Sequence, residues 1–160
     1  IGIINNDYKK IKQKEKQFNK WDYKLVKHWL GYKICYKNRK NIESFDYSFP
    51  FLDIISYKKQ GNKLIPSLKT IRDTWPKCYF NLKDHYPLKP YKFGDFYING
   101  PNKPEPYFIR LYEKQWNKIA YRLYDHQEEE ILEPIKVKLT KEMKKPAKPT
   151  QIKKRRCIKK

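Results

Sequence analysis

Glycine is scarce in this chain: only five of its 160 residues are glycine. No glycine-rich loop that could hold a nucleotide phosphate is present, and neither is a G-x-S-x-G or H-E-x-x-H pattern. The three histidines, His28, His85 and His126, are far apart in the sequence. Asp84 and His85 are adjacent, but neighbours on a strand point to opposite faces and cannot act as an acid–base pair. We therefore assign no catalytic residue and predict that the chain is not an enzyme.

Cysteine is also rare, with only Cys35, Cys78 and Cys157 in the chain. No two of them have C-x-x-C spacing or the spacing of a Cys and His zinc site. An odd number of distant cysteines favours reduced thiols over a disulfide framework. The sequence therefore predicts no metal site and no cofactor.

Long hydrophobic runs are missing as well. Only 39% of the residues are hydrophobic, and no apolar run approaches the roughly 20 residues that cross a bilayer. Aromatic residues nevertheless make up 16% of the chain, whereas disordered chains are poor in aromatics. We expect a small folded body with a thin core, no membrane span and no small-molecule substrate.

Acidic residues are few beside basic ones: 17 Asp and Glu stand against 38 Lys and Arg, a formal net charge of +21. A protein with this charge repels itself unless a polyanion neutralises it. The usual polyanion is nucleic acid, because phosphate contacts release counterions. No RRM signature, KH loop or zinc knuckle is present. Exposed aromatics beside lysines could stack on bases, although we expect most aromatics to be buried in the core.

Charge divides the chain into three parts: a basic N-terminal arm at 1–20, a small globular body at 21–134 and a basic extension at 135–160. Neither end has enough apolar residues for a core, so we expect both to become ordered only against partners. The predicted fold class is α+β, with a small antiparallel sheet, a few short helices and extended basic arms at both ends. The cations expected to bind RNA are Lys9, Lys10, Lys12, Lys14, Lys37, Arg39, Lys40, Lys144, Lys145, Lys148, Lys153, Lys154, Arg155 and Arg156.

The stretch from Trp75 to Gly100 is the part of the body most able to build a core. Residues 78–82 and 93–98 are aromatic and β-branched, which predicts two strands. Asn99-Gly100 followed by a proline predicts a tight turn. Alternation along the second strand places Phe96 and Ile98 on one face and Tyr97 on the other. The side chains expected in the core are Trp75, Tyr79, Phe80, Phe93, Phe96 and Ile98.

Hydrophobic periodicity predicts the elements that precede this stretch. Apolar residues at helical spacing over 21–32 indicate a helix that Gly31 ends, and alternation over 32–37 indicates a strand. Residues 51–55 are expected to form a short helix on the core. Another helix is expected to start near Pro66.

Three further segments complete the body. Residues 60–62 predict a turn. Residues 107–124 fit either a helix or a hairpin, and their aromatic and β-branched content favours the hairpin. The acidic run at 128–130 is expected to face solvent or a basic neighbour.

Two motifs of the body resemble a known family. Cys-Tyr-Phe-Asn-Leu at 78–82, a proline-bearing spacer, and Lys-Phe-Gly-Asp-Phe-Tyr-Ile-Asn-Gly at 92–100 resemble the mitochondrial small-subunit ribosomal protein family numbered thirty-four. The likeness covers residues 52–130 and extends loosely to Gly61, Leu64, Ile71, Trp75, Trp116 and Glu128 to Glu130. The chain departs from the family in two respects: only one glycine lies in 52–75, and the basic tail is not carried over from it.

The resemblance implies a protein of the mitochondrial small subunit that contacts protein and RNA and has no activity of its own. Charge and the missing active-site motifs favour the same class of protein. We therefore predict a structural constituent of the mitochondrial ribosome, in the mitochondrial matrix, that contacts rRNA and neighbouring ribosomal proteins. The alternatives are an accessory subunit of another mitochondrial complex, for example a respiratory one, and an RNA-processing factor.

Overall fold

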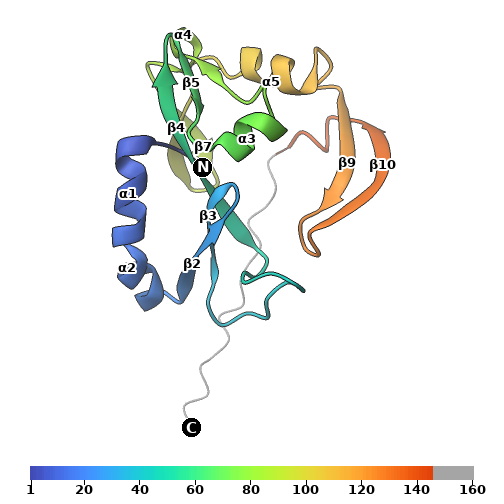
Figure 1. Ribbon diagram of the computed structural model, residues 1–160. Helices are drawn as coiled ribbons and strands as arrows, with labels where there is room; N and C mark the ends of the chain where they lie inside the picture. The colour runs from blue at the N-terminus through green and yellow to red at the C-terminus, as the bar shows by residue number, and fades with distance from the viewer. Residues whose placement is uncertain (146–160) are drawn as a thin grey trace.

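The computed structural model describes residues 1–145 and combines short helices with antiparallel sheets, which confirms the α+β class (Figure 1). None of the helices in this range is long and apolar enough to cross a bilayer. In chain order, the elements are β1 (Gly2–Ile4), α1 (Asn5–Gln13), α2 (Glu15–Lys20), β2 (Tyr23–His28), β3 (Gly31–Tyr36), β4 (Phe51–Gln60), β5 (Lys63–Pro66), α3 (Lys69–Thr74), β6 (Phe80–Asn81), α4 (Leu82–His85), β7 (Lys89–Phe93), β8 (Phe96–Gly100), α5 (Glu105–Tyr112), β9 (Ile119–Asp125) and β10 (Glu130–Lys138).

The main sheet is organised around the long strand β4. Its order is β2-β3-β4-β5-β6, and β1 joins β4 as a parallel neighbour. The first half of β4, residues 51–54, pairs with β3, and the second half, residues 57–60, pairs with β5. One strand therefore carries both halves of the sheet.

Residues 21–32 contain a strand instead of the predicted helix, so that prediction is wrong. Gly31 supplies the reason: its φ of +132° is unfavourable for other residues, and a Cβ there would clash with the Ile54 carbonyl oxygen. Gly31 thus begins a strand held tightly against β4. The pairs Tyr23 with Tyr36 and His28 with Gly31 close the β2–β3 hairpin, and β3 confirms the strand predicted over 32–37.

Residues 51–55 also form a strand, the start of β4, where the sequence predicts a short helix. β-Branched Ile54 and Ile55 favour a pleated surface, and neighbouring strands on both sides satisfy the backbone of β4. The predicted turn at 60–62 does join β4 to β5. The helix predicted near Pro66 is α3.

The core is thin and lies on the main sheet. Cys35, Ile42 and Tyr47 form a buried cluster, and Val26, Phe45 and Phe51 pack against it. On the other half of the sheet, Tyr57 and Cys78 are buried, with the tyrosine hydroxyl 3.6 Å from the sulfur.

The stretch from Trp75 to Gly100 is not the core, which corrects the prediction. Tyr79 and Phe80 are half-buried. The other four expected core residues are largely in solvent: 42%, 60%, 53% and 44% of the surface is exposed at Trp75, Phe93, Phe96 and Ile98. The reason is topological, because most of this stretch lies outside the main sheet.

The strands in this stretch also differ from the predicted ones in their bounds. Only Phe80–Asn81 of the segment 78–82 joins the main sheet, and α4 follows at once. β7 and β8 form a separate hairpin that turns at Gly94, whose φ is +69°, rather than at Asn99-Gly100. The register does place Phe96 and Ile98 on one face and Tyr97 on the other, as predicted, but that face carries no core.

Residues 107–124 contain both of the structures that the sequence allows. α5 ends at Tyr112, and Glu113, with a φ of +67°, turns the chain away from the helix. β9 then pairs with β10 in a second separate hairpin, which stands beside the main sheet in Figure 1.

The acidic run 128–130 lies at the turn of β9–β10 and divides between two environments. Glu128 and Glu130 are exposed, as expected. The Glu129 side chain is only 7% exposed and accepts a hydrogen bond of 2.7 Å from the Tyr47 hydroxyl. This hydrogen bond attaches the hairpin turn to the core.

The ends of the chain also differ from extended arms. Residues 1–20 form β1, α1 and α2, and β1 pairs with the middle of β4. Tyr8 and Ile11 of α1 are half-buried, and the Tyr8 ring stacks on Tyr32 with centroids 5.1 Å apart. At the other end, β10 continues to Lys138, so the folded part extends past residue 134.

Candidate nucleic-acid interface

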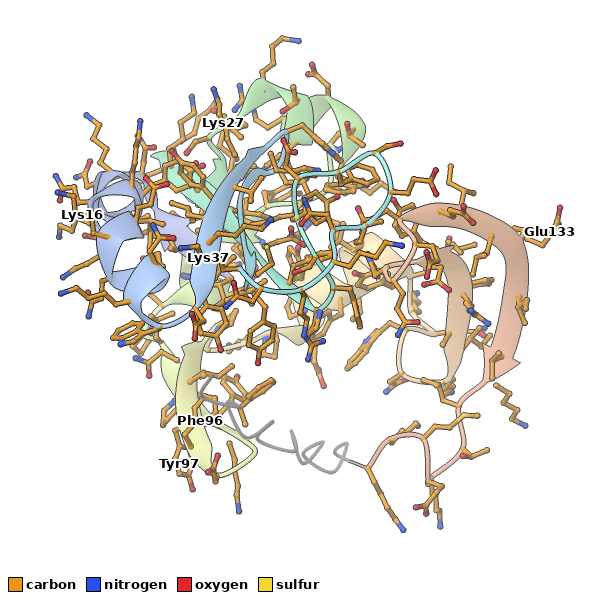
Figure 2. All side chains as sticks on the ribbon, turned by 90° about the horizontal axis from the view of Figure 1, so that it is seen from below. Lys16, Lys27, Lys37, Phe96, Tyr97 and Glu133 are labelled. Carbon is orange, nitrogen blue, oxygen red and sulfur yellow. The ribbon has the colours of Figure 1, made fainter. Side chains whose placement is uncertain are left out.

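Lysines gather where α1 meets α2. Lys14, Lys16 and Lys20 line a shallow hollow together with Gln13, Gln17 and Trp21. The Trp21 side chain is 58% exposed, so an indole ring lies open beside three ammonium groups. Figure 2 shows Lys16 on the outer side of these helices, away from the sheet.

The β2–β3 hairpin brings a second basic segment to the same place. The Lys37 amide donates to the Asp22 carbonyl at 2.8 Å, directly after α2 and Trp21. Arg39 and Lys40 follow in the exposed loop after β3. We call the surface formed by Lys14, Lys16, Lys20, Trp21, Lys37 and Arg39 the basic end of the sheet.

Aromatic rings support the cations at the basic end. Tyr23 and Tyr36 stack with ring centroids 4.9 Å apart, and the Arg39 guanidinium lies 4.7 Å from the centre of the Tyr36 ring. The hydrogen bond with Tyr36, together with partial burial, raises the pKa of Tyr23, so its hydroxyl stays neutral at physiological pH. The rings hold Arg39 in place by a cation–π contact without neutralising its charge.

The other predicted lysines of the N-terminal segment lie on α1. Lys9, Lys10 and Lys12 are exposed, and Lys10 pairs with Asp7 at 2.6 Å. Residues 1–20 contain six lysines against the two acids Asp7 and Glu15, so the helices carry a surplus of four positive charges. Packing of Tyr8 and Ile11 against the body fixes the side of α1 on which these lysines stand.

The C-terminal cations are only partly described by the structure. Lys144 and Lys145 are exposed in the turn after β10, and Lys145 pairs with Glu142. The five remaining predicted cations, Lys148, Lys153, Lys154, Arg155 and Arg156, lie outside the described residues.

Away from the basic end, a cluster of polar side chains lies buried between the main sheet and the turn of β9–β10. The Lys33 side chain is 2% exposed, pairs with Asp53 at 2.9 Å and lies 3.5 Å from the centre of the Phe51 ring. Tyr47 contacts the same ammonium group and bonds Glu129; burial, followed by that hydrogen bond, raises the pKa of Tyr47. The Lys33 ammonium group is thus held by a carboxylate and two aromatic rings, which favours a structural role over a reaction site.

His28 adjoins this polar group, with its ring 5.6 Å from the Tyr47 ring and perpendicular to it. Burial, and then the charge of Lys33, lowers the pKa of His28 below its ordinary value of 6.5. The imidazole is therefore neutral at physiological pH.

Within residues 1–145, no three His, Cys, Asp or Glu side chains come close enough together to hold a metal ion. Cys35 and Cys78 are both buried and free. The basic end carries only nitrogen cations and aromatic rings, a set suited to anions.

Of the cations at the basic end, the sequence predicted Lys14, Lys37 and Arg39. It did not single out Lys16 and Lys20, and it missed the aromatic rings. Trp21 and Tyr23 lie within the helix predicted over 21–32, and the sequence did not single them out as ligand contacts. The available signal was local: Trp21 follows directly after Lys20, at the end of a lysine-rich segment. The proximity of Tyr36 and Lys37 depends on strand pairing, which no local pattern shows.

Two bacterial proteins are similar to this chain. It is 32% identical over 154 residues to an uncharacterized protein of Rickettsia prowazekii (strain Madrid E), a match that covers 93% of this chain and 53% of that protein. It is 31% identical over 154 residues to an uncharacterized protein of Rickettsia typhi (strain ATCC VR-144 / Wilmington), with 93% and 44% covered. The chain thus spans about half the length of the curated relatives it matches. No protein-family profile and no solved structure matches it.

These relatives correct the predicted location. Both are proteins of Rickettsia, which are bacteria and have no mitochondria, so the similarity argues against a protein of the mitochondrial matrix. The chain is similar to bacterial proteins over nearly its whole length.

Proposed function

We propose that this chain is a non-catalytic nucleic-acid-binding component that holds a phosphate backbone on the basic end of the sheet. The observation that carries this proposal is the convergence of two basic segments, 14–20 and 37–40, which the fold brings together although they are separate in sequence. Lys16 and Lys20 lie on α2, and Lys14, Lys37 and Arg39 lie in the turns that adjoin α2 and β3.

The charge balance favours a phosphate backbone over an acidic protein. Glu15 and Asp22 are the acids closest in sequence to the hollow, and their two negative charges compare with five positive ones, on Lys14, Lys16, Lys20, Lys37 and Arg39. A protein partner would need an equally dense acidic surface, whereas a nucleic acid offers one charge per phosphate. Such contacts position a backbone and do not read sequence.

RNA within a ribonucleoprotein is the partner that we propose, and the ribosome is the assembly that the sequence favours. A structural constituent of a ribosome needs no active site and uses this type of basic surface. Sedimentation of cell lysate would show the chain with ribosomal subunits if this assembly is right, and in the soluble fraction if it is wrong.

Charge reversal tests the proposed surface directly. The variant Lys14→Glu/Lys16→Glu/Lys20→Glu should lower RNA affinity at least about tenfold and reduce the slope of log affinity against log salt by roughly two, since each phosphate contact on a single strand contributes about 0.7. Binding of the full chain to a short RNA, measured across a salt series, gives both quantities.

The matched control changes the same charge at the opposite end of the sheet. Lys58, Lys59 and Lys83 are exposed near the turn between β4 and β5, and Lys58→Glu/Lys59→Glu/Lys83→Glu alters the net charge by the same amount. A smaller loss in the control supports a localised surface. Equal losses in both variants would mean that net charge alone attracts RNA.

A further inference from the structure

The β7–β8 hairpin carries aromatic rings that the fold does not use. It is a two-stranded sheet separate from the main one, and all of its residues except Gly100 are exposed. Phe93 pairs with Phe96 beside the turn, and Lys92 pairs with Tyr97 on the other face. Figure 2 shows Phe96 and Tyr97 at the outer end of the hairpin, directed away from the body.

One ring of the hairpin has a structural role, and the others do not. Tyr91 covers Gly100, where a Cβ would clash with its ring, and donates a hydrogen bond to the Pro101 carbonyl at 2.6 Å. Phe93 and Phe96 contact each other with centroids 5.6 Å apart and tilted planes, and each keeps more than half of its surface exposed. Tyr97 is 68% exposed.

The base of the hairpin adjoins the start of the basic helices. A cleft of about 240 Å³ has Gly2, Ile3 and Ile4 on one side and Asn99, Gly100 and Pro101 on another. β1 leads directly into α1, so the helix that carries these lysines and the β7–β8 hairpin both start beside this cleft. In Figure 2 the hairpin and Lys16 lie on the same side of the molecule.

We propose that Phe93, Phe96 and Tyr97 stack on unpaired bases, so that the chain prefers single-stranded over double-stranded nucleic acid; this rests on the proposed backbone binding. Every base has a flat face that stacks on an aromatic ring, and a duplex hides those faces. Lys89 and Lys92 stand among the rings with one acid, Asp95, which suits a strand that carries phosphates.

The size of the hairpin favours bases over a protein surface. A stable protein interface buries about 800 Å² on each partner around a packed centre. Phe93, Phe96 and Ile98 lie on one face of the hairpin and Tyr97 lies on the other, so the exposed apolar side chains do not gather into one such centre. Stacking needs only one ring for each base, and the hairpin supplies rings on both faces.

The test compares three probes of equal length: a short oligouridylate, an abasic strand and a duplex. Wild type should bind the oligouridylate at least about tenfold more tightly than the abasic strand and the duplex, a ratio within the range of one to two stacked bases. Phe93→Ala/Phe96→Ala/Tyr97→Ala should remove this preference and leave the abasic affinity unchanged. Because all three side chains are exposed, the variant should keep the circular dichroism spectrum and melting temperature of wild type.

Tyr112→Ala and Tyr121→Ala are the controls, because both remove an exposed ring from other elements. They should bind all three probes as wild type does. An unchanged preference in the triple variant, or equal wild-type affinity for the abasic strand and the oligouridylate, overturns the stacking proposal and leaves the rings for a protein partner. Failure to bind any of the three probes overturns the proposed function itself.

Discussion

The β7–β8 and β9–β10 hairpins are both two-stranded and antiparallel, and within residues 1–145 neither pairs with the main sheet. They differ at their turns. The turn of β9–β10 reaches the core, where Glu129 accepts a hydrogen bond from buried Tyr47. The turn of β7–β8 ends in Phe93 and Phe96, which lie in solvent.

An isolated two-stranded hairpin is at best marginally stable in water. β9–β10 gains support at its far end from the body, whereas β7–β8 is supported mainly at its base, through Tyr91 and the cleft beside β1. Exposed aromatic side chains therefore have different roles in the two hairpins. Those at the free turn are available to a ligand, and a hairpin fixed at both ends serves as structure.

The largest difference in stability is expected between two tyrosine substitutions, one at the core residue that holds the turn of β9–β10 and one at the free turn of β7–β8. Tyr47→Ala removes a ring that is 1% exposed, and we expect a loss of about 3–5 kcal/mol in the free energy of unfolding. Tyr97→Ala should cost less than about 0.5 kcal/mol, because an exposed ring makes few contacts. Urea denaturation measures both values. Similar losses would show that the Tyr97 ring also supports the fold.

Removal of the acceptor at the anchored turn should have an intermediate effect. Glu129→Ala leaves the buried Tyr47 hydroxyl unpaired, which we expect to cost about 1–3 kcal/mol. Hydrogen exchange should accelerate in β9 and β10 and stay unchanged in β7 and β8. Glu133→Ala, an exposed position on β10 (Figure 2), is the matched control and should be nearly neutral. Acceleration in both hairpins would contradict a local anchor.

Mild acid should have the smallest effect on the two hairpins. His28 packs against the Tyr47 anchor and His85 lines the cleft at the base of β7–β8, and burial is the first cause that lowers the pKa of each below 6.5. Lys33 lowers the pKa of His28 further, while Asp53 and Glu129 oppose this shift. Because the unfolded chain takes up protons first as the pH falls below 6.5, stability should decrease on acidification.

The pH experiment distinguishes the two histidines. Urea midpoints at about pH 7.5 and about pH 5.5 should fall with acid in wild type, and His28→Gln and His85→Gln should each reduce the fall. Acid should accelerate hydrogen exchange in β9–β10 because of His28 and in β7–β8 because of His85. A midpoint that does not change between these pH values would contradict the predicted direction.

Local sequence patterns predicted the parts of the fold that depend on near neighbours. Alternation over 32–37 identified β3, and the turn at 60–62 and the start of α3 followed from glycine and proline. The helix predicted over 21–32 failed although Leu25, His28 and Trp29 have helical spacing, because residues 23–28 pair with β3 and Gly31 lies close to Ile54. That approach is a tertiary contact.

Burial and the candidate site required the same long-range information. The aromatic residues of 75–100 have the composition of a core, yet strand pairing leaves β7–β8 outside the main sheet. Charge alone predicted Lys14, Lys37 and Arg39 of the candidate interface but not Lys16 and Lys20. Their assembly with Lys37 and Arg39 depends on the β2–β3 register, and the exposure of Phe93 and Phe96 depends on the absence of a covering layer over β7–β8 in the described part of the chain.

The bulge in β10 has a consequence for association between copies of the chain. Within residues 1–145, β10 pairs only with β9, so its other edge could template a further strand. The register shifts between Ile131 and Ile135, and Pro134 in that interval has no backbone N–H to offer a neighbour. Lys136 and Lys138 add like charges along the same strand. Such an edge resists sheet-to-sheet polymerisation, so copies of the chain at high local concentration can stay separate instead of growing into a fibre.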